Sequence, residues 1–239
     1  MGRKLLEYLF PSRCVVCNKV LKKSEKYYCT KCSKSLHWIS GPVCMRCGKP
    51  LSCKEQEYCY DCQKKGQAFD KGFALWVYDK TMKGAIARMK YGGDREHIDY
   101  FALEAVKCFG DRWRDLCLDA IIPVPLHPER QEFRGFNQAG LIAEKIGQAI
   151  DVPVLQDVLI RTVATAPQKG LDHKARKKNV AKAFEIAPEK MTRVMQCNSV
   201  MLLDDIYTTG NTINACANKL RQSGVTEIYF FCLCTGEDI

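Results

Sequence analysis

Two adjacent carboxylates, Asp204 and Asp205, directly follow an apolar run at residues 200–203. An unbroken apolar run of this length is typical of a strand that is buried on both faces of a parallel sheet. Successive side chains of a strand point to opposite faces, and open α/β folds bind ligands at the carboxyl edge of the sheet. We therefore expect at least one of these carboxylates to lie at that edge, where it can accept hydrogen bonds from sugar hydroxyls.

A small hydroxyl-rich turn comes immediately after the acid pair. It contains Thr208, Thr209, Gly210, Asn211 and Thr212. Apolar residues then recur with helical spacing from Ile213 to Leu220, which predicts a helix whose free N–H groups face the turn. Backbone N–H groups and hydroxyls bind phosphate, and a glycine lets the backbone approach it closely. The strand, acids, turn and helix together predict a sugar-phosphate site.

The stretch DDIYTTGNT resembles the phosphoribosyl pyrophosphate (PRPP) motif of type I phosphoribosyltransferases. The resemblance implies that PRPP binds here with Mg²⁺. If the protein is catalytic, it also implies attack at the ribose C1 with loss of pyrophosphate. Such a reaction depends on orientation and charge neutralisation more than on a general base. No motif in the chain identifies the acceptor, so the sequence leaves enzymatic activity open.

A cysteine repeat occupies residues 14–62. Its eight cysteines form four CxxC pairs: Cys14, Cys17, Cys29, Cys32, Cys44, Cys47, Cys59 and Cys62. Two such pairs make a closed tetrahedral site for Zn²⁺, so we predict two zinc ribbons formed by the first four and the last four cysteines. Cys53 and His37 are alternative ligands, although four cysteines already complete each site. A redox role is disfavoured because thioredoxin-like proteins carry a single CxxC motif.

The chain of 239 residues is long enough for one full domain and a smaller appendage. We predict a double zinc ribbon at residues 1–65 that needs metal to fold, and an α/β domain with a parallel sheet flanked by helices at residues 66–239. Residues 63–70 read as a polar linker. Six further cysteines lack ligand spacing and are expected to be small core side chains. They are Cys108, Cys117, Cys197, Cys216, Cys232 and Cys234.

Basic residues are concentrated in the first 65 positions, where 14 Lys and Arg face 5 Asp and Glu. The surplus of positive charge in this segment is +9, against +1 for the remaining residues. It indicates one of two things: a binding surface for nucleic acid or another acidic partner, or a lysine-rich face that is merely solvated. No apolar run is long enough to span a bilayer, and the first residues do not form a signal peptide. We therefore expect a cytoplasmic protein without membrane insertion.

Further basic residues are candidates for the phosphate groups of PRPP. Residues 126–135 read as a charged loop after a short strand, and this resembles the pyrophosphate loop of type I phosphoribosyltransferases, with Arg130 and Arg134 as forked donors. Lys90, beside a glycine pair, is suited either to a phosphate or to capping its own helix. In the resembling fold a mobile lid occupies the interval 165–178. Arg176, and after it Lys174, are the candidates for a lid residue that contacts pyrophosphate. The alternative interpretation of this interval is a solvated basic helix.

The stretch RGFNQ at residues 134–138 resembles the signature of the ComF family, in which a type I phosphoribosyltransferase fold carries an N-terminal zinc ribbon. This resemblance extends over nearly the whole chain. It implies a cytoplasmic role in natural competence, namely the uptake and handling of transforming single-stranded DNA. It also implies a competence helicase and a recombination mediator as possible protein partners, with single-stranded DNA as a possible ligand.

Two other functions remain open from the sequence. The first is a nucleobase phosphoribosyltransferase of salvage, which the double ribbon disfavours because salvage enzymes of this fold generally lack one. Product formation from a free base would distinguish it. The second is a non-catalytic PRPP-sensing or nucleic-acid-binding module, in which the basic ribbon follows the phosphate backbone and the affinity falls steeply with salt.

Overall fold

The computed structural model describes residues 11–92, 95–162 and 183–237. The elements, in chain order, are α2 (Thr30–Ser33), α3 (Tyr60–Lys64), β1 (Lys71–Val77), α4 (Lys80–Tyr91), α5 (Arg95–Arg114), β2 (Ala120–Pro123), α6 (Pro128–Arg134), α7 (Gln138–Ile150), β3 (Leu159–Arg161), β4 (Phe184–Ile186), η1 (Pro188–Lys190), α9 (Met191–Met195), β5 (Ser199–Tyr207), α10 (Asn211–Gln222) and β6 (Glu227–Thr235).

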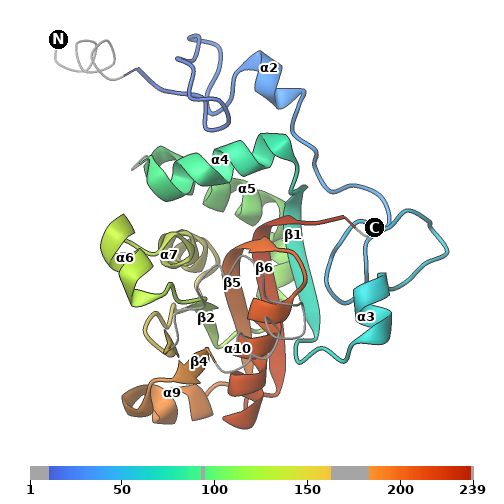
Figure 1. The fold of residues 1–239 in the computed structure, drawn as a ribbon, viewed down its shortest axis with the longest axis vertical. Helices are drawn as coiled ribbons and strands as arrows, with labels where there is room; N and C mark the ends of the chain where they lie inside the picture. Colours follow the sequence, from blue (N-terminus) through green and yellow to red (C-terminus); the bar gives the residue numbers. More distant parts are fainter. Residues whose placement is uncertain (1–10, 93–94, 163–182, 238–239) are drawn as a thin grey trace, which may run out of the picture.

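A four-stranded parallel sheet forms the centre of the molecule, with the strand order β1-β6-β5-β2 (Figure 1). Helices α4, α5 and α7 cover one face, and α10 with the antiparallel pair β3–β4 covers the other. Alternate residues of β5 face these two layers, since Met201 belongs to the first core and Leu202 to the second. This two-sided burial explains the unbroken apolar run before the acid pair and confirms the predicted α/β sheet flanked by helices.

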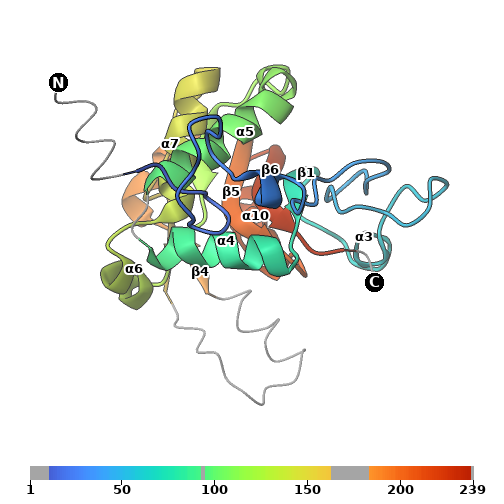
Figure 2. The ribbon, with the colours of Figure 1, turned by 90° about the horizontal axis from the view of Figure 1, so that it is seen from above.

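The two cysteine-rich segments pack on different parts of this core (Figures 1 and 2). The first lies against α5, where the rings of Tyr27 and Tyr100 are 4.9 Å apart. The second, which includes α3, lies beside β1, and the Arg46 carbonyl accepts a hydrogen bond of 2.7 Å from the Gly72 N–H. Both segments therefore share a core with the sheet domain, while the boundary between residues 65 and 66 stays a prediction.

The segment that joins the two ribbons covers the outer edge of β1. Trp38 forms an antiparallel bridge with Trp76, and the Ile39 N–H donates to the Leu75 carbonyl at 2.9 Å. The indole rings of the two tryptophans also lie 4.8 Å apart. An uncovered edge strand is a template for unwanted pairing, so this segment, which we call the edge strap (residues 37–39), protects the sheet.

Three expectations about local structure were wrong. Residues 126–135 are not all loop, because Pro128 and the left-handed Gly135 (φ +75°) start and end the helix α6. The stretch 63–70 is not simply a polar linker, since Phe69 is buried and its ring lies 4.8 Å from that of Phe230. Cys108 and Cys117 are exposed, whereas the other four cysteines outside the repeat are buried as expected.

No helix within the described ranges combines the length and apolar character needed to cross a bilayer. The expectation of a cytoplasmic location stays a prediction.

Candidate phosphate-binding site and cysteine clusters

The two carboxylates lie at the carboxyl end of β5 and face opposite sides of the sheet. Asp205 forms an ion pair with Lys90 of α4, on one face. Asp204 lies on the other face, within electrostatic reach of Arg161 on β3 and of the buried Cys216 on α10. At the sheet edge, Asp205 therefore has a direct cationic partner in Lys90. Asp204 makes no ion pair with the residues that the structure describes.

The electrostatic state of Asp204 differs from that of an ordinary aspartate. Burial, and then the neighbouring charge of Asp205, raise the pKa of Asp204 to about 7. The Asp205 N–H, which donates to Asp204 Oδ1 at 2.8 Å, opposes this shift together with Lys90 and Arg161. Burial and a second carboxylate thus disfavour the ionised form of Asp204, and a bound cation would stabilise that form.

The hydroxyl-rich turn forms a cradle at the start of α10. Residues 206–213 line a hollow of about 40 Å³, and Gly210 adopts a left-handed conformation with φ +76°. A Cβ at this position would lie 2.5 Å from the hydroxyl of the buried Tyr207. Both the backbone conformation and the close approach of Tyr207 therefore require glycine here.

We expect Gly210→Ala to destabilise the fold by about 1–3 kcal/mol and to weaken phosphate binding, because it adds backbone strain and displaces Tyr207. Gly224→Ala is the matched control. Gly224 has φ +98°, but its added Cβ would meet nothing within 4 Å. Urea unfolding and PRPP titration of both variants separate the two effects. Equal losses in both would show that the contact with Tyr207 is unimportant.

The two arginines expected to hold pyrophosphate both lie on α6. The Arg134 guanidinium lies 4.9 Å from the centre of the Tyr91 ring and donates to the Tyr91 hydroxyl at 3.0 Å. It also donates to Gln138 Oε1 at 3.2 Å, so its position is fixed by α4 and α7. Arg130 is exposed. The pKa of Arg161 is lowered first by the burial of Arg161 itself and then by the positive charge of the nearby Arg130.

The structure thus brings Lys90, Arg130, the acid pair and the turn to one edge of the sheet. Arg176 and Lys174, the lid candidates, lie outside the described residues. Sequence reasoning missed Arg161, which reaches the surroundings of Asp204 from β3. The sequence feature that could have identified Arg161 is its position at the end of a strand that directly precedes the lid interval.

The eight cysteines of the repeat gather in two groups with the pairing that their spacing predicts: 14/17/29/32 and 44/47/59/62. Within each group the four sulfur atoms lie within 4.8 Å of one another, and Cys47 Sγ is 3.5 Å from Cys59 Sγ. A tetrahedral Zn²⁺ with Zn–S bonds of about 2.3 Å has S–S edges of about 3.8 Å, so both groups fit zinc. The Cys29 N–H donates to Cys14 Sγ at 3.4 Å, as a thiolate ligand requires.

The two alternative ligands do not belong to these groups. The exposed Cys53 donates to Glu55 Oε2 at 2.5 Å. His37 Nδ1 lies 2.9 Å from Asp79 Oδ2, at the N-terminus of α4. The four cysteines of each group therefore supply a complete ligand set without either side chain.

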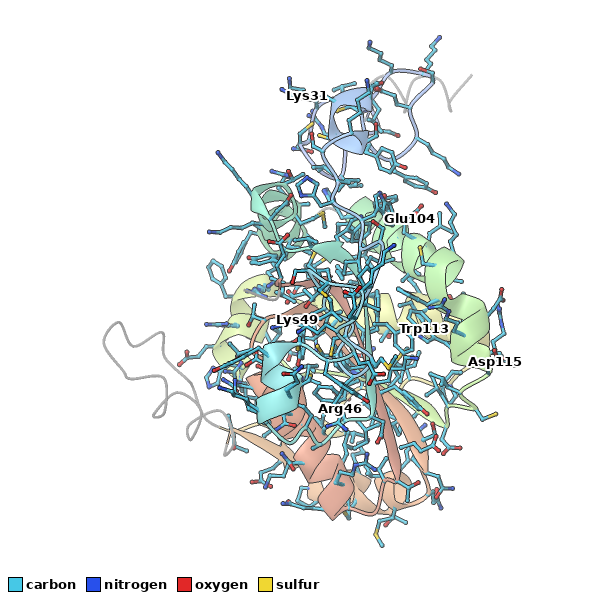
Figure 3. The ribbon with its side chains drawn as sticks, turned by 90° about the vertical axis from the view of Figure 1, so that its right-hand side faces the viewer. Lys31, Arg46, Lys49, Glu104, Trp113 and Asp115 are labelled. Atoms are coloured by element: carbon cyan, nitrogen blue, oxygen red, sulfur yellow. The ribbon has the colours of Figure 1, made fainter. Side chains whose placement is uncertain are left out.

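A buried lysine connects the second cysteine group to the cradle at residues 206–213. Lys49 is only 5% exposed, and its Nζ lies 3.2 Å from Asp61 Oδ2 and 5.9 Å from the centre of the Tyr207 ring. Tyr207 in turn stacks on Phe230 at 4.7 Å. Figure 3 shows Lys49 where the second ribbon meets the sheet. The lysine-rich composition of this segment suggested solvated side chains, so sequence reasoning did not identify this contact.

Comparisons with known proteins agree with this arrangement. Residues 5–63 match the double zinc ribbon domain family. The chain is 35% identical to competence protein F of Haemophilus influenzae over 172 residues, which is 69% of this chain and 72% of that protein. It is 30% identical to competence protein ComFC of Bacillus subtilis over 151 residues, covering 63% of this chain and 58% of that protein.

A purine phosphoribosyltransferase from Pyrococcus horikoshii is among the similar solved structures, at 16% identity. Its TM-score is 0.35, and the match covers 57% of this chain and 73% of that one. A TM-score of this size carries no argument about the site. The identity to competence protein F over most of both chains, together with the zinc-ribbon match, shows that the chain belongs to the ComF family.

Proposed function

We propose that this protein acts in natural competence, in the uptake and handling of transforming single-stranded DNA in the cytoplasm, and that it binds PRPP with Mg²⁺. The competence role is supported by the names of its relatives in Haemophilus and Bacillus. The PRPP part rests on one observation: an acid pair at the end of a buried parallel strand stands beside a hydroxyl-lined cradle at a helix N-terminus.

Each part of the site suits one part of PRPP. The cradle at residues 208–212 offers N–H groups and hydroxyls to the 5′-phosphate. Asp204 and Asp205 accept hydrogen bonds from the ribose hydroxyls, and Arg130 and Arg134 donate to the pyrophosphate. Mg²⁺ would bind the pyrophosphate beside Asp204 and neutralise its charge, in keeping with the raised pKa of Asp204.

The first ribbon supplies the surface that we assign to single-stranded DNA. Its exposed lysines lie on one small segment: Lys19, Lys22, Lys23, Lys26, Lys31 and Lys34. Figure 3 shows Lys31 at the end of the molecule far from the second ribbon. The acid in this segment, Glu25, accepts hydrogen bonds from the Lys22 and Thr30 N–H groups at 2.9 and 2.7 Å. A competence helicase and a recombination mediator are the protein partners that such a role would involve.

Calorimetric titration of PRPP and Mg²⁺ into zinc-loaded protein tests this proposal. We expect saturable binding to the wild type and loss of binding, by about 100-fold or more, in Asp204→Asn/Asp205→Asn. Asp111→Asn, at a fully exposed position of α5, is the control and should bind like the wild type. A folded double variant that binds PRPP normally would refute the ligand site. A wild type that fails to retard single-stranded DNA in a low-salt gel would refute the DNA surface.

A further inference from the structure

The end of helix α4 carries an aromatic side chain that lies mostly outside the core. Tyr91 is the last residue of α4 and is 62% exposed. Helix α6 lies beside this end of α4 (Figures 1 and 2). Because the ring buries little surface, a substitution of Tyr91 should leave the fold intact, and the contacts that Tyr91 makes can be tested by mutation.

Tyr91 holds the guanidinium of Arg134 on α6 by two contacts. The guanidinium lies 4.9 Å from the centre of the Tyr91 ring, and it donates to the Tyr91 hydroxyl at 3.0 Å. A third contact, to Gln138 Oε1 at 3.2 Å, is made with a side chain that is only 2% exposed. These hydrogen bonds use one N–H group on each terminal nitrogen, and a guanidinium has further N–H groups. Arg134 is therefore held in one orientation and can still donate to a ligand.

The same turn of α4 also contacts the acid pair. Lys90, the residue before Tyr91, forms an ion pair with Asp205 near the end of β5. Two consecutive residues of α4 thus contact Asp205 of β5 and Arg134 of α6. The end of α4 therefore connects the group that we assign to the ribose with the group that we assign to the pyrophosphate.

An arginine that is held in place before a ligand arrives binds that ligand more tightly. A free arginine side chain loses rotamer freedom when it binds a phosphate, and this loss opposes binding. A stacked and hydrogen-bonded guanidinium has already lost this freedom in the folded protein. The gain in affinity applies only to a ligand that Arg134 contacts. It should therefore favour PRPP over a ribose phosphate that lacks the pyrophosphate.

We propose that Tyr91 is a positioning residue that orients Arg134 toward the pyrophosphate of PRPP, and that it thereby makes the site selective for PRPP over ribose 5-phosphate. This proposal rests on the proposed function, because it takes PRPP as the ligand. Tyr91 acts through Arg134, so its effect should disappear when Arg134 is removed.

Calorimetric titrations with PRPP and with ribose 5-phosphate, each in the presence of Mg²⁺, test this role. We expect Tyr91→Ala to weaken PRPP binding about tenfold and to leave the affinity for ribose 5-phosphate within about twofold of the wild type. Tyr91→Phe keeps the ring against the guanidinium and should weaken PRPP binding only about threefold. Phe133→Ala removes an 81% exposed ring from the same helix as Arg134. It is the control and should bind both ligands like the wild type.

A double variant tests whether Tyr91 acts through Arg134. Arg134→Ala should weaken PRPP binding more than Tyr91→Ala does, and the addition of Tyr91→Ala to Arg134→Ala should cause no further loss. Additive losses would refute the positioning role, since Tyr91 would then act independently of Arg134. Thermal unfolding of Tyr91→Ala should give a midpoint within about 2 °C of the wild type.

The other outcomes separate this inference from the proposed function. If the wild type and Tyr91→Ala bind PRPP equally well, the role of Tyr91 is refuted and the PRPP site remains. Equal losses of both ligands in Tyr91→Ala would also refute this role, because a general effect on the fold does not depend on pyrophosphate. A wild type that binds ribose 5-phosphate as tightly as PRPP would refute the selectivity. A wild type that binds neither ligand would refute both proposals.

Discussion

Cys47→Ser is expected to abolish PRPP binding, whereas Cys17→Ser should leave the PRPP affinity within about threefold of the wild type. Both changes remove one thiolate from a four-cysteine group, and both should lower the zinc content from two ions to one per chain. They differ in what the affected ribbon contacts. The first ribbon packs on α5, while the second packs against the residues on either side of the cradle.

The physical reason lies in the shared core of the second ribbon. Cys47 is fully buried and belongs to the same apolar cluster as Tyr207 and Ile213, which precede and follow the cradle. Lys49, two residues from Cys47, lies over the Tyr207 ring. Because a ribbon of this size cannot form a stable core without its metal, loss of zinc should release Tyr207 and with it the turn at Gly210.

The measurement combines zinc analysis by mass spectrometry with PRPP titration of both purified variants. Circular dichroism should show that the sheet domain of each variant keeps its helical signal. If Cys47→Ser loses its zinc but binds PRPP as tightly as the wild type, then the cradle does not depend on the second ribbon. If Cys17→Ser loses PRPP binding to the same degree as Cys47→Ser, then PRPP binding depends on both ribbons. The contact of the second ribbon with Tyr207 would then not explain the loss.

The second large effect concerns Asp204 and pH. Its pKa is about 7 in the folded protein against 3.8 for an unperturbed aspartate, so the native state retains a proton that the unfolded chain has lost. The stability that this proton provides is complete below about pH 4 and is lost as the pH rises to 7. Asp204→Asn cannot ionise and should therefore be more stable than the wild type at pH 8, by at most about 4 kcal/mol.

Thermal unfolding at pH 4.5 and pH 8 checks this expectation. The variant should gain stability only at the higher pH, and its amide oxygen can still accept the Asp205 N–H, so the local hydrogen bond is kept. A second readout is proton release, because Mg²⁺ and PRPP favour the ionised carboxylate and should expel the proton of Asp204 near pH 6.5. Calorimetry in two buffers of different ionisation enthalpy measures it. An equal gain of the variant at both pH values would contradict the raised pKa.

The sequence predicted those parts of the fold that are encoded locally. The apolar run before Asp204, the turn with Gly210 and the helical spacing after it are short-range signals, and the structure has the strand and helix that they predict. The CxxC spacing likewise predicted the two cysteine groups. The helix α6 was missed although Pro128 and Gly135 mark its ends, because the density of charged residues between them was read as a loop.

Contacts between distant segments were beyond such reasoning. The ion pair of Lys90 with Asp205 joins residues more than a hundred positions apart, and nothing near Lys90 distinguishes that partner from a phosphate. The burial of Lys49 is equally hidden, since a lysine in a basic segment is most often solvated. The position of Arg161 near Asp204 depends on the pairing of β3 with β4 across the interval 162–183.

The strand order has a consequence for how the protein is made. β6, the last strand along the chain, lies between β1 and β5, so that Lys71 pairs with Tyr229. During translation β1 leaves the ribosome first and must wait for more than 150 further residues before its permanent neighbour exists. The edge strap at residues 37–39 emerges even earlier and can occupy the other side of β1. One edge of β1 can therefore be covered before the strand that pairs with its other edge has been made.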